Sequence, residues 1–190
     1  MSNLPVWTSW AAFGLSLTGA LAIFVLSALS ALRSDFQFFP PPKKDSWQHK
    51  TFLALFRLYL YPLIGLSVLI FKPLEGTHAW AQYTVGGLLL LIGFGMAIRI
   101  TLYMGSRNAF GEKLGLMTTG WFAWSRNPIY VFTWLGMLGW TMIANSWLVA
   151  LLLSGWAIMY FIASIFDKPW LEEEYGADYL AYKQSVRRFI

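Results

Sequence analysis

The sequence has no cysteine, and it has only two histidines among its 190 residues. Without cysteine the chain forms no disulfide, has no thiolate nucleophile and offers no cysteine-ligated metal site. His49 and His78 stand far apart, in segments that are predicted to connect helices. We therefore expect each histidine to be a solvated or interfacial side chain, and we predict no metal site.

Charge is scarce as well. Only 12% of the residues are charged, whereas soluble proteins have about a quarter. Hydrophobic residues make up 57% and aromatic residues 18%, and Trp and Tyr are typical of membrane–water interfaces. This composition predicts an integral membrane protein. The net charge of +5 would also suit a nucleic-acid-binding protein, but the basic residues flank apolar segments and form no single stripe, so we predict no nucleic-acid partner.

Five apolar segments approach the length of about 20 residues that a transmembrane helix needs. They cover residues 9–32, 52–71, 80–104, 128–145 and 147–166. We therefore predict an all-α integral membrane protein with about five transmembrane helices. The last two form a C-terminal helical hairpin closed by the polar turn Asn145-Ser146. We divide the chain into an N-terminal three-span region, 1–104, and a C-terminal region, 105–190, within one integrated membrane domain.

Basic residues are unevenly divided between the two sets of connections. Segment 33–50 carries four Lys and Arg, segment 105–127 carries three, and the tail after residue 166 carries four. The connections on the opposite side carry only Lys72. Because cytoplasmic loops are enriched in Lys and Arg, we predict that the N-terminus lies outside and the C-terminus in the cytoplasm.

The stretch "SRNPIY", 125–130, puts polar residues at the start of the fourth predicted helix. Pro128 suits the first helical position and Asn127 suits the N-cap. One interpretation is structural: a capped helix start, with Arg126 reaching lipid phosphates. The other is functional, because a helix N-terminus beside an arginine favours binding of a carboxylate.

The tail, 166–190, predicts an amphipathic helix that lies at the cytoplasmic interface. Asp167-Lys168-Pro169 reads as a helix start, and acidic residues at 172–174 suit its first turns. Tyr175, Tyr179 and Tyr182 recur at spacings of three and four, which places them on one face. Asp167 lies at the predicted membrane edge, where an unpaired carboxylate is costly.

Two blocks together carry a resemblance to a known family. "TTGWFAWSRNPIYVFTWLGMLGW", a helical hairpin and "DKPWLEEEYGADYLAYKQSVRRFI" resemble the isoprenylcysteine carboxyl methyltransferase and phospholipid methyltransferase group of integral membrane methyltransferases. The resemblance covers about 105–190 and spans both blocks. It implies that S-adenosylmethionine (SAM) binds between the last spans and the cytoplasmic segments, and that a lipophilic acceptor enters from the bilayer. That acceptor would be a lipid, an isoprenylcysteine-like carboxylate or a small apolar molecule.

The resemblance also implies the residues of the site. Arg126 and Asp167 are the catalytic candidates. The cofactor-binding candidates are Leu116, Thr119, Gly120, Trp121, Arg126, Asn127, Pro128, Tyr130, Asp167, Lys168, Tyr179, Tyr182 and Arg187. The best-known members have His at the position of Asn127, whereas Asn is familiar there among bacterial relatives. The expected location is a bacterial inner membrane. Asp167-Lys168 replaces the Glu-Glu of the family pattern, and Lys168 reverses one charge.

The chemistry of SAM accommodates these residues. Arg126 and the helix N-terminus suit its carboxylate, Asp167 suits its ammonium, and aromatic rings suit its sulfonium. Two other functions stay open. A membrane reductase resembling the sterol reductases shares similar C-terminal elements, and Lys168 would suit a relative that has lost activity.

Overall fold

A computed structural model describes residues 5–33, 35–39, 41, 46–105 and 115–190, except the side chains of 31 and 166–170. The predicted all-α class is confirmed, since these residues form helices and no strand. The helices are α1 (Val6–Leu32), α2 (Trp47–Leu69), α3 (His78–Met104), the short 3-10 helix η1 (Gly120–Ala123), α5 (Pro128–Ala144) and α6 (Trp147–Ser185).

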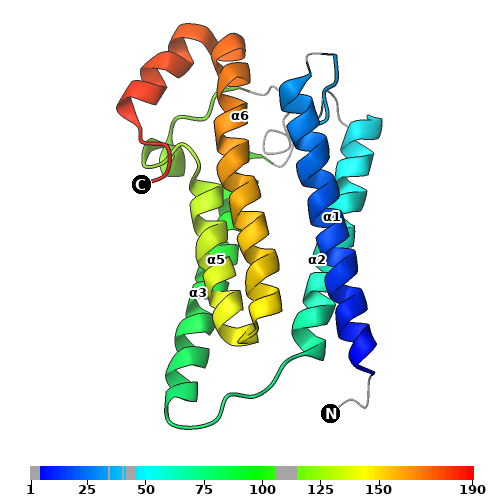
Figure 1. Cartoon of the computed structure of the whole chain (residues 1–190). Coiled ribbons are helices and arrows are strands. Elements are labelled where there is room, and N and C mark those ends of the chain that lie inside the picture. Colours follow the sequence, from blue (N-terminus) through cyan, green and yellow to red (C-terminus); the bar gives the residue numbers. More distant parts are fainter. Residues whose placement is uncertain (1–4, 34, 40, 42–45, 106–114) are drawn as a thin grey trace.

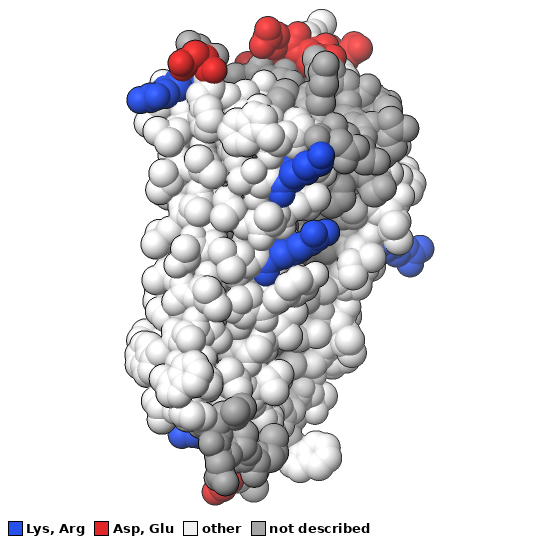
Figure 2. All heavy atoms as spheres, turned by 90° about the vertical axis from the view of Figure 1, so that its right-hand side faces the viewer, with Lys and Arg blue, Asp and Glu red and all other residues white. Residues whose placement is uncertain are grey.

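The chain is an integral membrane protein. Four segments are long and apolar enough to cross a membrane, namely Val6–Ser30, Trp47–Leu69, His78–Met104 and Trp147–Ile165. The fifth apolar helix, α5, has 17 residues and is shorter, so the count of five spans stays a prediction. Large apolar side chains face outward on these helices: Trp80 is 81% exposed and Leu91 is 70% exposed. On the face shown in Figure 2, acidic side chains lie at the two ends, and the surface between them is mostly uncharged apart from a few Lys or Arg side chains.

Two helix pairs and one further helix make the bundle. α1 packs along α2, and α3 packs along α5. α6 contacts α5 as well as α1 and α2, and it lies between the two pairs (Figure 1). We call the end at which α1 and α3 finish and α2 and α5 begin the upper end, as it stands in Figure 1.

The α3–α5 pair is close because glycines face each other across it. A Cβ atom on Gly93 would overlap backbone atoms of Gly136, and one on Gly139 would overlap the backbone of Gly86. Small residues let two helix backbones approach closely in membranes. This contact holds the start of α5 beside the end of α3 at the upper end.

Tyr59 of α2 joins three helices through satisfied polar groups. It is fully buried, its hydroxyl donates to the Leu152 carbonyl of α6 at 3.1 Å, and the Ser16 hydroxyl of α1 donates to its carbonyl at 2.6 Å. Its ring meets that of Trp156 edge to face, with 5.6 Å between centroids. Buried polar groups in a bilayer need such partners, so these bonds fix α6 against the α1–α2 pair.

The last helix breaks at a different place from the one predicted. Residues 166–170 are helical, so the helix start predicted at Asp167-Lys168-Pro169 is wrong. The break is at Gly176, whose φ of 50° and ψ of −124° lie in a region that only glycine adopts readily. Lys183 and Glu172, eleven residues apart, form an ion pair of 2.7 Å across the break. The final turns therefore fold back over the upper end (Figure 1).

Candidate functional site

The tail of the chain binds the segment that starts α5. The backbone N–H of Arg126 donates to the Arg187 carbonyl at 3.0 Å. The Asn127 side-chain amide and the Ser125 hydroxyl donate to the Arg188 carbonyl, at 3.0 and 3.3 Å. These bonds join residues more than 60 positions apart in the sequence.

Asn127 takes the N-cap position, with Pro128 first in the helix, as predicted. However, the Asn127 side chain makes no capping hydrogen bond, so that part of the prediction is wrong. The hydroxyl of Ser125 accepts the Asn127 backbone N–H instead, at 3.1 Å. The Asn127 side chain is thereby available to hold the tail.

An aromatic side chain fixes the tail between two helices. The ring of Phe189 lies 4.9 Å from that of Trp134 in α5 and 5.9 Å from that of Phe161 in α6. Such ring pairs are worth about 0.5–1.5 kcal/mol each. The tail is therefore part of the wall at the upper end.

The tyrosine face of the final turns packs against the protein itself. Tyr179 and Tyr182 are buried with Ile100 of α3 and Phe122 of η1. The Tyr182 hydroxyl donates to the Phe122 carbonyl at 2.7 Å, which fixes the ring. The face predicted from the tyrosine spacing is present, and it covers the end of α3 and η1.

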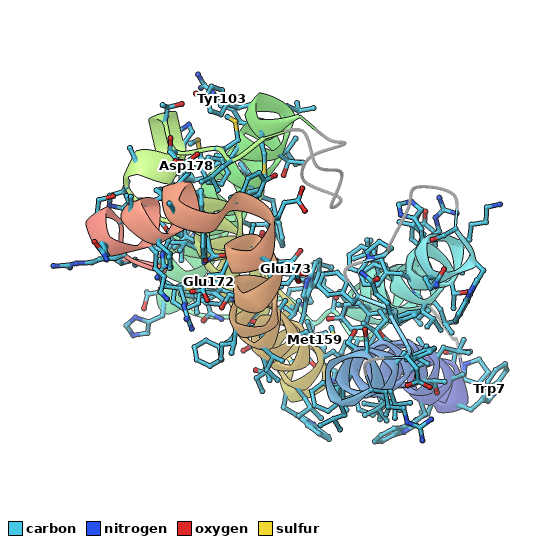
Figure 3. The ribbon with its side chains drawn as sticks, turned by 90° about the horizontal axis from the view of Figure 1, so that it is seen from above. Trp7, Tyr103, Met159, Glu172, Glu173 and Asp178 are labelled. Carbon is cyan, nitrogen blue, oxygen red and sulfur yellow. The ribbon has the colours of Figure 1, made fainter. Side chains whose placement is uncertain are left out.

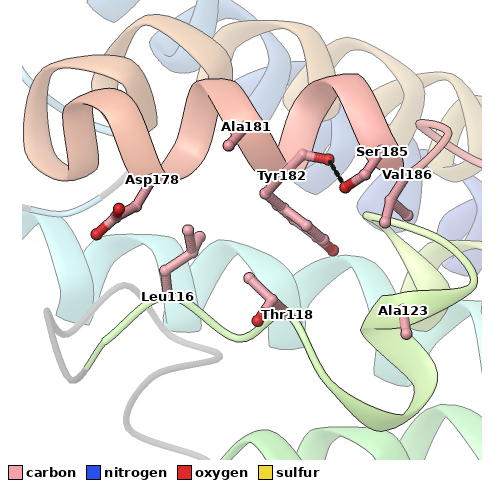
Figure 4. A pocket seen from close by; sticks show the side chains of 8 residues that line it. All are labelled: Leu116, Thr118, Ala123, Asp178, Ala181, Tyr182, Ser185 and Val186. Atoms are coloured by element: carbon pink, nitrogen blue, oxygen red, sulfur yellow. Dashed lines mark hydrogen bonds between the residues drawn. The ribbon is translucent and has the colours of Figure 1, made fainter.

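A pocket of about 830 Å³ lies between these final turns and the segment before α5. This volume falls within the range of small-molecule sites, about 300–1,000 Å³. The lining residues are Leu116, Thr118, Ala123, Asp178, Ala181, Tyr182, Ser185 and Val186. Figure 4 shows Asp178 at one end, the Tyr182 ring in the middle and Val186 with Ala123 at the other end.

Arg126 brings positive charge close to this pocket. Burial raises the pKa of Tyr182 to about 12, the nearby Arg126 guanidinium lowers it, and Tyr179 raises it. The Nε atom of Arg126 is buried and has no hydrogen-bond partner among the described residues. A buried donor without a partner destabilises a fold by about 1–3 kcal/mol. This guanidinium is therefore suited to bind an anion.

The other predicted site residues are placed as follows. Leu116 and Tyr182 line the pocket, and Tyr179 packs beside it. Thr119, Gly120 and Trp121 belong to the adjoining turn, where Gly120 has a φ of 62° and closely approaches the Tyr103 ring. Tyr130 stacks on Tyr160 with 4.4 Å between ring centroids and is not among the lining residues. The side chains of Asp167 and Lys168 lie outside the described residues.

Several lining residues were not predicted. Asp178 and Ser185 stand four residues before and three after Tyr182, so all three share one helix face. That spacing is visible in the sequence and could have identified them. Thr118 and Val186 come from irregular segments and Ala123 ends the short helix η1, and no spacing rule places a side chain there.

The fold defines an all-α integral membrane protein, and the described residues form an open pocket at one end of its helix bundle. A model of the phospholipid methyltransferase family matches residues 81–178, which is just over half of the chain. The chain belongs to this family, and membership implies a membrane methyltransferase. Comparison with curated proteins gave no match, and comparison with solved structures gave none either.

Proposed function

We propose that the protein transfers a methyl group from SAM to a lipophilic acceptor at the cytoplasmic face of a bacterial inner membrane. The observation that carries this proposal is the position of the family match. Residues 81–178 include most of α3, the segment before α5, the start of α5 and Asp178, and they supply four of the eight described residues that line the pocket.

The residues at the upper end fit the charges of SAM. The buried Nε of Arg126, which has no partner in the described part of the chain, suits the carboxylate. The fixed ring of Tyr182 suits the sulfonium by a cation–π contact. Asp167 stays the candidate for the ammonium, and the cofactor residues implied by the resemblance stay proposals beside these.

When bound, SAM supplies a sulfonium methyl group: the acceptor lone pair forms the new bond to carbon while the carbon–sulfur electrons pass to sulfur. The chain has to align the reactants and keep water away. The rigid wall made by the tail, η1 and the final turns of α6 suits that task. An anionic acceptor needs no base, whereas an amine must also release a proton.

Calorimetry of the purified protein with S-adenosylhomocysteine (SAH) tests the proposal. We expect saturable binding, and we expect Arg126→Ala to weaken it by more than about tenfold, or 1.4 kcal/mol. The matched control is Arg33→Ala, which removes an exposed cation after α1, on the opposite helix pair. The control should bind as the wild type does.

Two results would contradict this function. Absence of SAH binding by protein that keeps its helical circular dichroism and elutes as one species would reject it. Saturable binding of NADPH with no binding of SAM would favour the reductase instead. Unchanged SAH affinity in Arg126→Ala would reject the role of that residue alone.

A further inference from the structure

Among the described residues that line the pocket, Asp178 is the only charged one. It is exposed, and its carboxylate makes no hydrogen bond or ion pair with any residue that the structure describes. In Figure 4 it stands at the pocket end farthest from Val186. An unpaired carboxylate at one end of a pocket selects a ligand that presents hydroxyl groups or positive charge there.

The regular rise of the helix gives approximate distances between lining residues along the pocket. Asp178, Tyr182 and Ser185 lie on one face of α6, at about 0, 6 and 10 Å along its axis. Arg126 belongs to the far end, because its backbone N–H binds the carbonyl of Arg187, the residue after Val186. The backbone of Arg126 is therefore anchored at the end of the pocket opposite Asp178.

This separation decides which part of the cofactor reaches Asp178. In SAM the carboxylate and the ammonium are attached to the same carbon, so a carboxylate held by Arg126 keeps the ammonium at that end. The sulfonium comes next, beside the Tyr182 ring. The ribose hydroxyls lie beyond the sulfur, on the side away from the amino acid.

On the basis of the proposed function, we infer that Asp178 binds the ribose of the adenosine cofactor by accepting hydrogen bonds from its hydroxyl groups. A carboxylate has two acceptor oxygens, and its hydrogen bonds are stronger than those between neutral groups. An acidic side chain has the same function for ribose in dinucleotide-binding folds. No bond forms or breaks in this step.

Binding of three ligands to the full chain tests the inference: SAM, SAH and 5′-methylthioadenosine. SAH lacks the sulfonium charge, and methylthioadenosine lacks the amino acid as well, but all three keep the ribose. We expect Asp178→Ala to weaken all three to a similar extent, by about tenfold or more. The matched control is Glu173→Ala, an exposed acid of the same helix that points toward the α1–α2 side, away from Asp178 (Figure 3).

Each other pattern overturns the inference. A loss confined to SAM would place Asp178 at the sulfonium, and a loss for SAM and SAH alone would place it at the ammonium. Unchanged binding of all three would remove Asp178 from the site while leaving the proposed function intact. If the folded wild type bound none of them, both proposals would fail.

A deoxy ligand gives a second, independent readout. The 2′,3′-dideoxy form of SAH should bind the wild type about tenfold more weakly than SAH does. In Asp178→Ala the two ligands should bind alike, because the acceptor for the hydroxyls is gone. A difference of the same size in wild type and variant would overturn the inference.

Discussion

Tyr182 belongs both to the packing of the upper end and to the wall of the pocket. The residue is 7% exposed, and its hydroxyl donates a hydrogen bond to the Phe122 carbonyl. The proton on this hydroxyl is what makes the bond, since an ionised tyrosine cannot donate. The protonation state of one residue therefore affects the stability of the site.

We predict that Tyr182→Phe removes a stabilising contribution that depends on pH. The pKa of Tyr182 is raised from 10.0 to about 12, so the unfolded chain loses this proton first as pH rises. The contribution is therefore complete below pH 10 and is lost between about pH 10 and 12. Chemical unfolding in detergent should show the variant to be about 1 kcal/mol less stable at pH 8.

The same comparison above pH 10 checks the cause. The difference in unfolding free energy between wild type and Tyr182→Phe should shrink as pH approaches 12. A difference that stays constant from pH 8 to 12 would show that ionisation of this hydroxyl is not involved.

At the scale of residues, the sequence identified side chains but not their partners. The tyrosine spacing correctly placed Tyr179 and Tyr182 on one face, but it did not predict that this face is buried against Ile100 and Phe122. The partner of the Asn127 amide is a backbone carbonyl 61 residues away, and every residue type carries such a carbonyl. No sequence pattern therefore distinguishes Arg188 as that partner.

At the scale of helices, the glycines of α3 and α5 are likewise visible in the sequence, but the contacts between them are not. We predict that Gly93→Ala destabilises the protein by about 1–3 kcal/mol, because its Cβ would meet the backbone of Gly136, which cannot move aside alone. Thermal unfolding in a fixed detergent measures the change.

Gly95→Ala is the matched control on the same helix. A Cβ atom there has no other atom within 4 Å, and alanine favours a helix over glycine by about 1 kcal/mol. It should leave stability unchanged or raise it. Equal losses from Gly93→Ala and Gly95→Ala would contradict the proposed close contact between α3 and α5.

The positions of the long helices were predictable, because an apolar run of membrane length has few other structures available. Their ends were less so. α2 begins at Trp47, five residues before the predicted 52, since the Ser46 hydroxyl accepts the His49 N–H and caps a polar first turn. The break in α6 was predicted at the wrong place because Pro169 suggested the start of a new helix. The chain turns instead at Gly176, which has a positive φ.

At the scale of the whole molecule, the polar elements gather at one end. The tail, η1, the start of α5 and the pocket all lie at the upper end, where the connections also hold most of the Lys and Arg residues. A cofactor made in the cytoplasm reaches the pocket directly only if that end faces the cytoplasm. The orientation of the chain therefore bears on its function.

Cysteine labelling tests this orientation, and the natural absence of cysteine provides a clean background. We predict that Thr77→Cys and Ser146→Cys, at the turns of the lower end, react with a membrane-impermeant maleimide added outside intact cells. Gln184→Cys, which is exposed at the upper end, should react only after the membrane is opened. The positive charge of the upper connections opposes their translocation, which is the physical reason for expecting the upper end inside and the lower end outside.

Equal labelling of Thr77→Cys and Ser146→Cys would also favour an α5 that crosses the membrane fully despite its 17 residues. The chain would then cross once in α3 and return to the same side in α5. Labelling of Gln184→Cys in intact cells would place the pocket outside and contradict methyl transfer from a cytoplasmic cofactor.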